Sequence, residues 1–249
     1  DLVVSLTGAF EGNSSIAAGN VIGSNIFNTL MILGLTAVIF PLQVTRSNRR
    51  LDIPITLGVT VLFIAVSLTG SLGRLGGALF LTVFAAYIFF CFKTNKADGQ
   101  EESPENQPGR AASLRNGLPG QILLIALGLA ALVFGGRLLV DSACRIARAA
   151  GVGDKFIAVT VLAAGTSLPE LATGVVAAFK GKSQLALGNI LGSNVFNILL
   201  ILGASALVSP LSLAEISIVD KAALFASAGL LGLWSYTGKR ERIDRWEGA

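Results

Sequence analysis

The ten residues GNVIGSNIFN at 19–28 return as GNILGSNVFN at 188–197. The likeness is longer than the motif, because residues 1–42 align without a gap on 170–211 and twenty of these 42 positions are identical. Further on, GRLGGA at 73–78 and DRWEGA at 244–249 share a frame near the same offset. A duplication of this length predicts an architecture built from two related halves.

Both copies lie in strongly apolar surroundings. Hydrophobic residues make up 53% of the 249 residues and charged residues only 14%, whereas about a quarter of the residues of soluble domains are charged. A helix that crosses a bilayer needs roughly 20 mostly apolar residues. We therefore expect an all-α polytopic membrane protein, in which residues 1–10 end one helix and further spans cover 15–40, 53–68, 75–92, 118–140, 156–179, 184–208 and 214–236.

The number of crossings sets the relative orientation of the two copies. Five membrane passages separate Asp1 from its repeat equivalent Glu170, and an odd number turns the second copy upside down. This pattern predicts an inverted-topology repeat of five-helix units, an architecture of many secondary transporters. We expect a first repeat at 1–93, a flexible polar loop at 94–117 and a second repeat at 118–249, in which 141–155 is a polar link.

The first residue of the chain and the distribution of its basic residues lead to two further expectations. The chain begins with Asp1, inside the repeat pattern, so we expect a protein truncated at both ends. Lys and Arg gather in the loops at 45–50, 93–117 and 180–183 and in the tail, which predicts that these face the cytoplasm of a multi-pass protein in the inner or plasma membrane. This topology places Cys91 and Cys144 at opposite faces, which argues against a disulfide. The lipid bilayer is the expected partner, nothing indicates nucleic acid, and the sequence does not encode the oligomeric state.

Polar residues inside the spans are the candidate functional groups. A carboxylate at membrane depth, such as Glu170, marks an ion or proton path by default. In GTSLPE (165–170), Gly165 and Pro169 predict a broken helix with freed backbone carbonyls, although a simple proline kink is an alternative. Asn189, Ser193 and Asn197 share a helix face through their spacing of four, where they line a site or join helices by hydrogen bonds.

The donors available in the two copies are oxygen atoms. Carboxylates, hydroxyls, amides and freed carbonyls form a cage that suits hard cations such as Ca²⁺ and Na⁺. The chain has no histidine, so imidazole metal sites and histidine proton relays are excluded. Two acids neutralise one Ca²⁺, or hold Na⁺ ions at neighbouring points, which is a basis for competition between the two ions.

GTSLPE followed by GNILGSNVFN, repeated as DLVVSL with GNVIGSNIFN, resembles the α-repeats of the sodium/calcium exchanger branch of the calcium/cation antiporter superfamily. The resemblance implies a ten-helix exchanger fold, of which this chain holds part of the second helix through the ninth. It implies a transporter rather than an enzyme, with Ca²⁺ and Na⁺ as transported ions and no cofactor. It further implies a set of cation ligands: Asp1, Ser24, Asn28, Ala163, Thr166, Ser167, Glu170, Ser193 and Asn197.

Three other functions are weighed against Na⁺/Ca²⁺ exchange. Proton/calcium antiporters resemble this chain but tend to carry a glutamate after the GN pair, which GNVIG and GNILG lack. A cation channel requires a continuous pore, and inverted repeats with central acids fit alternating access better. The GVGD at 151–154 is similar to the motif of intramembrane aspartyl proteases, but no second aspartate in a suitable setting completes the catalytic pair. Asn197 stands where potassium-dependent exchangers tend to carry aspartate, which argues against coupling to potassium without deciding it.

Overall fold

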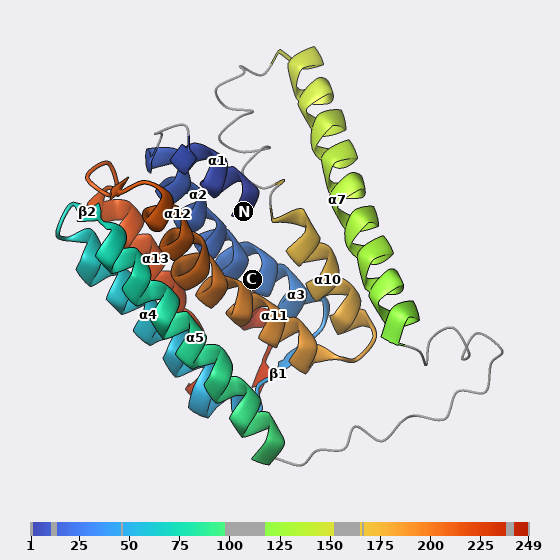
Figure 1. The fold of residues 1–249 in the computed structure, drawn as a ribbon. Coiled ribbons are helices and arrows are strands. Elements are labelled where there is room, and N and C mark those ends of the chain that lie inside the picture. Colours follow the sequence, from blue (N-terminus) through green and yellow to red (C-terminus); the bar gives the residue numbers. More distant parts are fainter. Residues whose placement is uncertain are drawn as a thin grey trace.

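A computed structural model describes residues 2–10, 14–45, 47–97, 118–151, 165, 167–237 and 242–248. These residues are almost wholly helical, and the long helix α7 stands at the edge of the bundle beside α10 (Figure 1). The helices of the first half are α1 Leu2–Phe10, α2 Ser14–Phe27, η1 Asn28–Ile32, α3 Leu33–Ile39, η2 Asn48–Asp52, α4 Ile53–Ser67 and α5 Arg74–Ala97. Those of the second half are α7 Leu118–Ala149, α10 Leu168–Phe179, α11 Ser183–Phe196, η4 Asn197–Ile201, α12 Leu202–Val208, α13 Ile218–Thr237 and α14 Arg245–Gly248.

Five helical segments of the described residues are long and apolar enough to cross a bilayer, namely 17–39, 48–67, 74–93, 183–208 and 218–236. The predicted all-α membrane class is therefore confirmed, and these spans lie within a few residues of their expected positions. Both motif-bearing spans end just before a proline, Pro41 or Pro210. Proline cannot continue a helix, which explains the common stop.

Two boundaries differ from the sequence prediction. The expected polar link from residue 141 is wrong at its start, because α7 continues to Ala149. Its last turns hold alanine and arginine, which are good helix formers whatever their polarity. The last long helix begins at Ile218 rather than at residue 214, because Ser217 and Asp220 form its N-terminal cap, in which the Ser217 N–H donates to Asp220 Oδ2 at 3.0 Å.

Two short strand pairs join the halves to each other. β1 (Leu42–Gln43) pairs antiparallel with β4 (Arg242–Ile243), and β2 (Ser71–Leu72) pairs antiparallel with β3 (Leu211–Ser212). β1 and β3 occupy equivalent places in the two repeats, and so do β2 and β4. Each pair therefore takes one strand from each half, and the two pairs are related by the internal symmetry.

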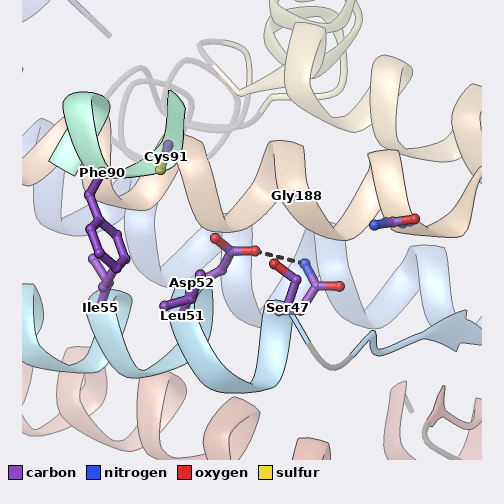
Figure 2. A pocket seen from close by; sticks show the side chains of 9 residues that line it. Ser47, Leu51, Asp52, Ile55, Phe90, Cys91 and Gly188 are labelled. Atoms are coloured by element: carbon purple, nitrogen blue, oxygen red, sulfur yellow. Dashed lines mark hydrogen bonds between the residues drawn. The ribbon is translucent and has the colours of Figure 1, made fainter. Parts of the chain in front are cut away.

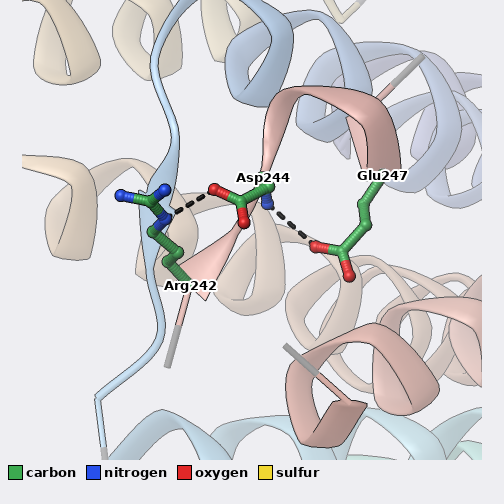
Figure 3. A network of polar contacts seen from close by, with 3 residues as sticks. All are labelled: Arg242, Asp244 and Glu247. Atoms are coloured by element: carbon green, nitrogen blue, oxygen red, sulfur yellow. Dashed lines mark hydrogen bonds and ion pairs between the residues drawn. The ribbon is translucent and has the colours of Figure 1, made fainter. Parts of the chain in front are cut away.

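The residues after β4 repeat the start of α5. The Asp244 N–H donates to Glu247 Oε2 at 2.8 Å, and Arg242 forms an ion pair with Asp244 (Figure 3). The contact between Asp244 and Glu247 is a helix N-terminal capping interaction. It starts the short helix α14, whose position in the second repeat matches the first turn of α5.

The buried core lies where the two motif-bearing spans cross. Apolar side chains of α2, α4, α5 and α12 form one buried cluster, and those of α3, α10 and α11 form another. A tight turn at Gly181, whose φ of 71° favours glycine, folds α10 back against α11. This turn brings the GTSLPE segment to the side of the second motif.

Candidate functional site

The two motif-bearing spans contain the same irregularity at the same place. A π-helical turn, η1, begins at Asn28 in the first copy, and η4 begins at Asn197 in the second. A π turn adds a residue to the helical turn and so changes the direction of the side chains around it; such turns occur frequently at functional sites. In both repeats it falls on the last asparagine of the motif.

Four asparagines meet where these spans cross. Asn28 Nδ2 donates to Asn194 Oδ1 at 3.2 Å, and Asn197 Nδ2 donates to Asn25 Oδ1 at 3.0 Å. These two bonds are symmetry equivalents, because Asn25 matches Asn194 and Asn28 matches Asn197 in the repeat. The earlier asparagine of one span meets the later one of the other, so the spans run in opposite directions, as an inverted repeat requires.

A threonine completes the network on one side. Asn194 Nδ2 donates to Thr29 Oγ1 at 2.8 Å, and this hydroxyl donates to the Asn25 carbonyl at 2.9 Å. Asn25 Nδ2 in turn donates to the Asn194 backbone carbonyl at 3.2 Å. All these side chains are buried. We call Asn25, Asn28, Thr29, Asn194 and Asn197 the asparagine clasp.

The start of α10 brings a carboxylate to the same region. Ser167 precedes the helix with non-helical φ and ψ of −101° and 5°, and Pro169 lies in the first turn. This start agrees with the predicted helix break, whose upstream part lies outside the described residues. α10 packs against α11 and against η1, so its first turn, which holds Glu170, belongs to a helix in contact with both motif-bearing spans.

Three buried oxygens of the predicted ligand set have no hydrogen-bond partner within the described part of the chain: Asn28 Oδ1, Ser167 Oγ and Glu170 Oε2. Burial of an unpaired polar group costs about 1–3 kcal/mol, so such groups need an explanation. Hard cations take oxygen ligands, so a bound cation is a group that oxygens of this kind could coordinate. Ser205 Oγ is another buried hydroxyl without a partner among the described residues, and it lies on α12 about two turns after Asn197.

Apart from Asn197 in the clasp, the other predicted ligands are two serines and three residues outside the described ranges. Ser24 is buried on α2, one turn before Asn28, and Ser193 is half-buried on α11, one turn before Asn197. Asp1, Ala163 and Thr166 lie outside the described residues. The structure therefore brings the predicted amides together and sets α10 beside them, and all nine cation ligands stay predictions.

Sequence reasoning missed Asn25, Thr29 and Asn194. Both asparagines stand in the repeated GSN and lie three residues before Asn28 or Asn197, a spacing that shares a helix face. That spacing could have indicated that Asn25 and Asn194 lie on the same helix face as the predicted ligands. Joining of helices by hydrogen bonds does describe two other asparagines, since Asn20 Nδ2 donates to Ser5 Oγ at 3.2 Å and Asn189 Nδ2 to Thr173 Oγ1 at 3.1 Å.

A separate polar pocket of about 200 Å³ lies on the other side of α11, beside α4 and α5 (Figure 2). There Asp52 accepts a hydrogen bond of 2.9 Å from Asn48, near Cys91 and Gly188. At 100° per residue, Gly188 and Asn197 point to opposite sides of their span. This pocket is therefore distinct from the candidate cation site.

The sequence profile described as "Sodium/calcium exchanger protein" matches residues 1–93 and 120–249. The chain belongs to the sodium/calcium exchanger family. This exchanger is 32% identical over 281 residues to the sodium/calcium exchanger MaX1 of Methanosarcina acetivorans, an alignment that covers 100% of the chain and 80% of the relative. It is 35% identical over 265 residues to CaxA of Alkalimonas amylolytica, whose name describes an antiporter, with 100% and 78% covered.

Solved structures show the same fold. The sodium-calcium exchanger NCX_Mj soaked with zero Na⁺ and Ca²⁺ superposes with a TM-score of 0.79 and 28% identity, covering 99% of this chain and 76% of that chain. NCX_Mj soaked with 2.5 mM Na⁺ and 10 mM Sr²⁺ also gives 0.79, at 30% identity. The exchanger is thus an integral helical membrane protein with inverted repeats, and its family consists of cation antiporters rather than enzymes.

Proposed function

We propose that this chain exchanges Na⁺ for Ca²⁺ across the membrane by alternating access, with both ions bound at overlapping positions between the two repeats. The observation that carries the proposal is the set of three buried oxygens without partners, one each from Asn28, Ser167 and Glu170. They come from both halves of the chain, which is where inverted-repeat transporters bind their substrates. Ser24, Ser193 and Asn197 add oxygens from the same two spans, and Asp1, Ala163 and Thr166 complete the proposed ligand set.

Charge supports an exchange of these two ions. The described ligands contain one carboxylate, Glu170, and its repeat equivalent Asp1 would supply a second. Together they balance one Ca²⁺ ion or two Na⁺ ions at neighbouring points. Because the same oxygens would serve either ion, binding of one excludes the other, as antiport requires.

The domain division and the orientation stay proposals of the same kind. We propose one repeat at 1–93 and another at 118–249, joined through 94–117 on the cytoplasmic side. The helix α5 runs past residue 93 to Ala97. The argument for orientation is the excess of Lys and Arg in the loops on that side.

Reconstituted flux tests the proposal. We would load proteoliposomes with Na⁺, dilute them into Na⁺-free medium and follow ⁴⁵Ca²⁺ uptake while an ionophore holds the pH equal on both sides. Saturable uptake that depends on internal Na⁺, and that does not change when K⁺ is omitted, is the expected result. In a second assay without the ionophore, uptake that follows an imposed pH gradient and ignores Na⁺ would establish the H⁺/Ca²⁺ alternative. Unsaturable uptake without a counter-ion would establish a channel.

A further inference from the structure

The asparagine clasp controls which atoms of Asn28 and Asn197 are available to an ion. We propose that Asn25 and Asn194 are positioning residues: each accepts the amide N–H of the opposite repeat's ligand asparagine and so turns that ligand's oxygen toward the cation. This inference rests on the proposed function only in taking Asn28 and Asn197 as cation ligands.

The polarity of the amide group is the first argument. The planar side-chain amide of asparagine has an oxygen on one side and the donor nitrogen on the other. Asn28 Nδ2 donates to Asn194 Oδ1, so Asn28 Oδ1 faces away from Asn194. That oxygen is buried and has no partner among the described residues. A reversed Asn28 amide would set two oxygens against each other, and a network of this kind is what assigns the orientation of an amide.

The positioning asparagines are themselves held in one orientation. Asn194 cannot reverse its amide without losing the bond from Nδ2 to Thr29 Oγ1 as well as the bond that it accepts from Asn28. Asn25 likewise donates to the Asn194 backbone carbonyl while it accepts from Asn197. Each positioning residue therefore presents an oxygen to its ligand residue because its own nitrogen is already engaged.

The same polarity selects the residue type at the ligand positions. An aspartate at 28 or 197 would offer a carboxylate oxygen to the oxygen of Asn194 or Asn25, where the native amide offers a hydrogen. Two buried acceptors in contact repel each other. The clasp thus favours a neutral side chain that donates a hydrogen at both positions, and the charge of the site stays with its carboxylates.

The clasp is asymmetric in a way that an experiment can use. The repeat equivalent of Thr29 is Ile198, which has no hydroxyl. The Thr29 hydroxyl therefore orients Asn194, and through it Asn28, whereas the equivalent position 198, beside the pair of Asn25 and Asn197, carries no hydroxyl. Removal of that one hydroxyl should weaken only one of the two ligand amides.

The first test compares buried side chains of the same size. Asn25→Leu and Asn194→Leu remove the acceptor oxygen, and we expect each to raise the KM for Ca²⁺ about 10-fold, the lower end of the effect of losing a group that orients a metal ligand. Thr29→Val should raise it about 3-fold. Thr60→Val is the control, because Thr60 is also buried but its hydroxyl donates to the carbonyl of Thr56, one turn back, and not to a clasp residue. An unchanged KM in both leucine variants, or equal effects of Thr29→Val and Thr60→Val, would overturn the proposal.

A double-mutant cycle separates positioning from a general structural role. Once Asn28→Ala has removed the ligand amide, Asn194→Leu has nothing left to orient, so the two effects on Ca²⁺ affinity should not add. Additive losses would show that Asn194 acts independently of Asn28. If a leucine variant does not fold, Thr29→Val combined with Asn28→Ala carries the same cycle.

A binding measurement keeps this inference distinct from the transport function. The Ca²⁺ concentration that gives half-maximal thermal stabilisation of the detergent-purified protein reports affinity without any flux. If wild-type protein binds Ca²⁺ but shows no Na⁺-driven uptake, the exchange function fails and the clasp is still measured. If uptake is normal but the half-maximal concentration is the same in Asn25→Leu, Asn194→Leu and wild type, the clasp fails alone.

Discussion

Gly248 and Gly34 meet so closely that a Cβ atom on Gly248 would lie 2.6 Å from the Gly34 carbonyl oxygen. The equivalent pair in the other half repeats this contact, since a Cβ on Gly77 would lie 2.8 Å from the carbonyl oxygen of Gly203. Small residues allow helices in a bilayer to approach at their backbones. The two crossings, α14 with α3 and α5 with α12, thus extend the internal symmetry beyond the repeated motif.

These crossings predict a matched effect in the two halves. Gly77→Ala and Gly248→Ala should each lower stability by about 1–3 kcal/mol, because the added methyl group forces backbones apart. Gly58→Ala is the control, since nothing lies within 4 Å of its Cβ position. Thermal unfolding in detergent measures all three. A Tm of Gly77→Ala equal to that of Gly58→Ala would contradict the close crossing.

Glu170 should be indispensable for exchange. Glu170→Gln keeps the volume and removes the charge, and loss of one partner of a buried ion contact costs about 3–5 kcal/mol, a factor of roughly 100 or more in affinity. We expect Na⁺-driven Ca²⁺ uptake at about 1% of wild type or below. Glu215→Gln, at an exposed carboxylate in the turn before α13, should retain near-normal uptake. Full activity of Glu170→Gln would refute the site.

Ser167 should show opposite effects with and without the ion. Its buried hydroxyl has no partner among the described residues, so Ser167→Ala should leave the Tm in Ca²⁺-free buffer unchanged or higher. The Ca²⁺ concentration for half-maximal stabilisation should rise several-fold, because an oxygen ligand is lost.

The control for this prediction is Ser227→Ala. Ser227 is also buried, but its hydroxyl donates to the Leu224 carbonyl at 2.9 Å. That variant should lower the Tm modestly and leave the dependence on Ca²⁺ unchanged. A Ser167→Ala protein that loses stability in Ca²⁺-free buffer but keeps its Ca²⁺ dependence would place the hydroxyl in a structural role.

Cys91 can report the orientation of the exchanger. It is a free, partly exposed thiol in the pocket beside Asp52, at the end of the span that leads to the basic loops. In a Cys144→Ala background, a membrane-impermeant maleimide should label it in inside-out vesicles and not in right-side-out vesicles. Labelling with the reverse preference would invert the proposed topology.

The sequence predicted the features of this fold that are local or repeated. Apolar length located the spans, and the duplicated motif predicted the inverted halves. Asn28 and Asn197 both lie where the motif-bearing spans cross, and each bonds to the earlier asparagine of the other span. The extension of α7 to Ala149 escaped prediction because polarity was read as a loop, although alanine and arginine favour helix. The π turns and the clasp depend on contacts between the halves. The sequence of one motif alone does not determine the direction in which the side-chain amide of Asn28 or Asn197 points, because its hydrogen-bond partner belongs to the other repeat.

The strand pairs β1 with β4 and β2 with β3 have a consequence for how the chain is assembled in the membrane. Each half ends its motif-bearing span in a strand whose hydrogen-bonding edge is completed only by the other half. After synthesis of the first half, the edges of β1 and β2 are unpaired. They acquire their partner strands after the second half has been inserted. The first half therefore enters the membrane unfinished, and the strands β3 and β4 of the second half complete it.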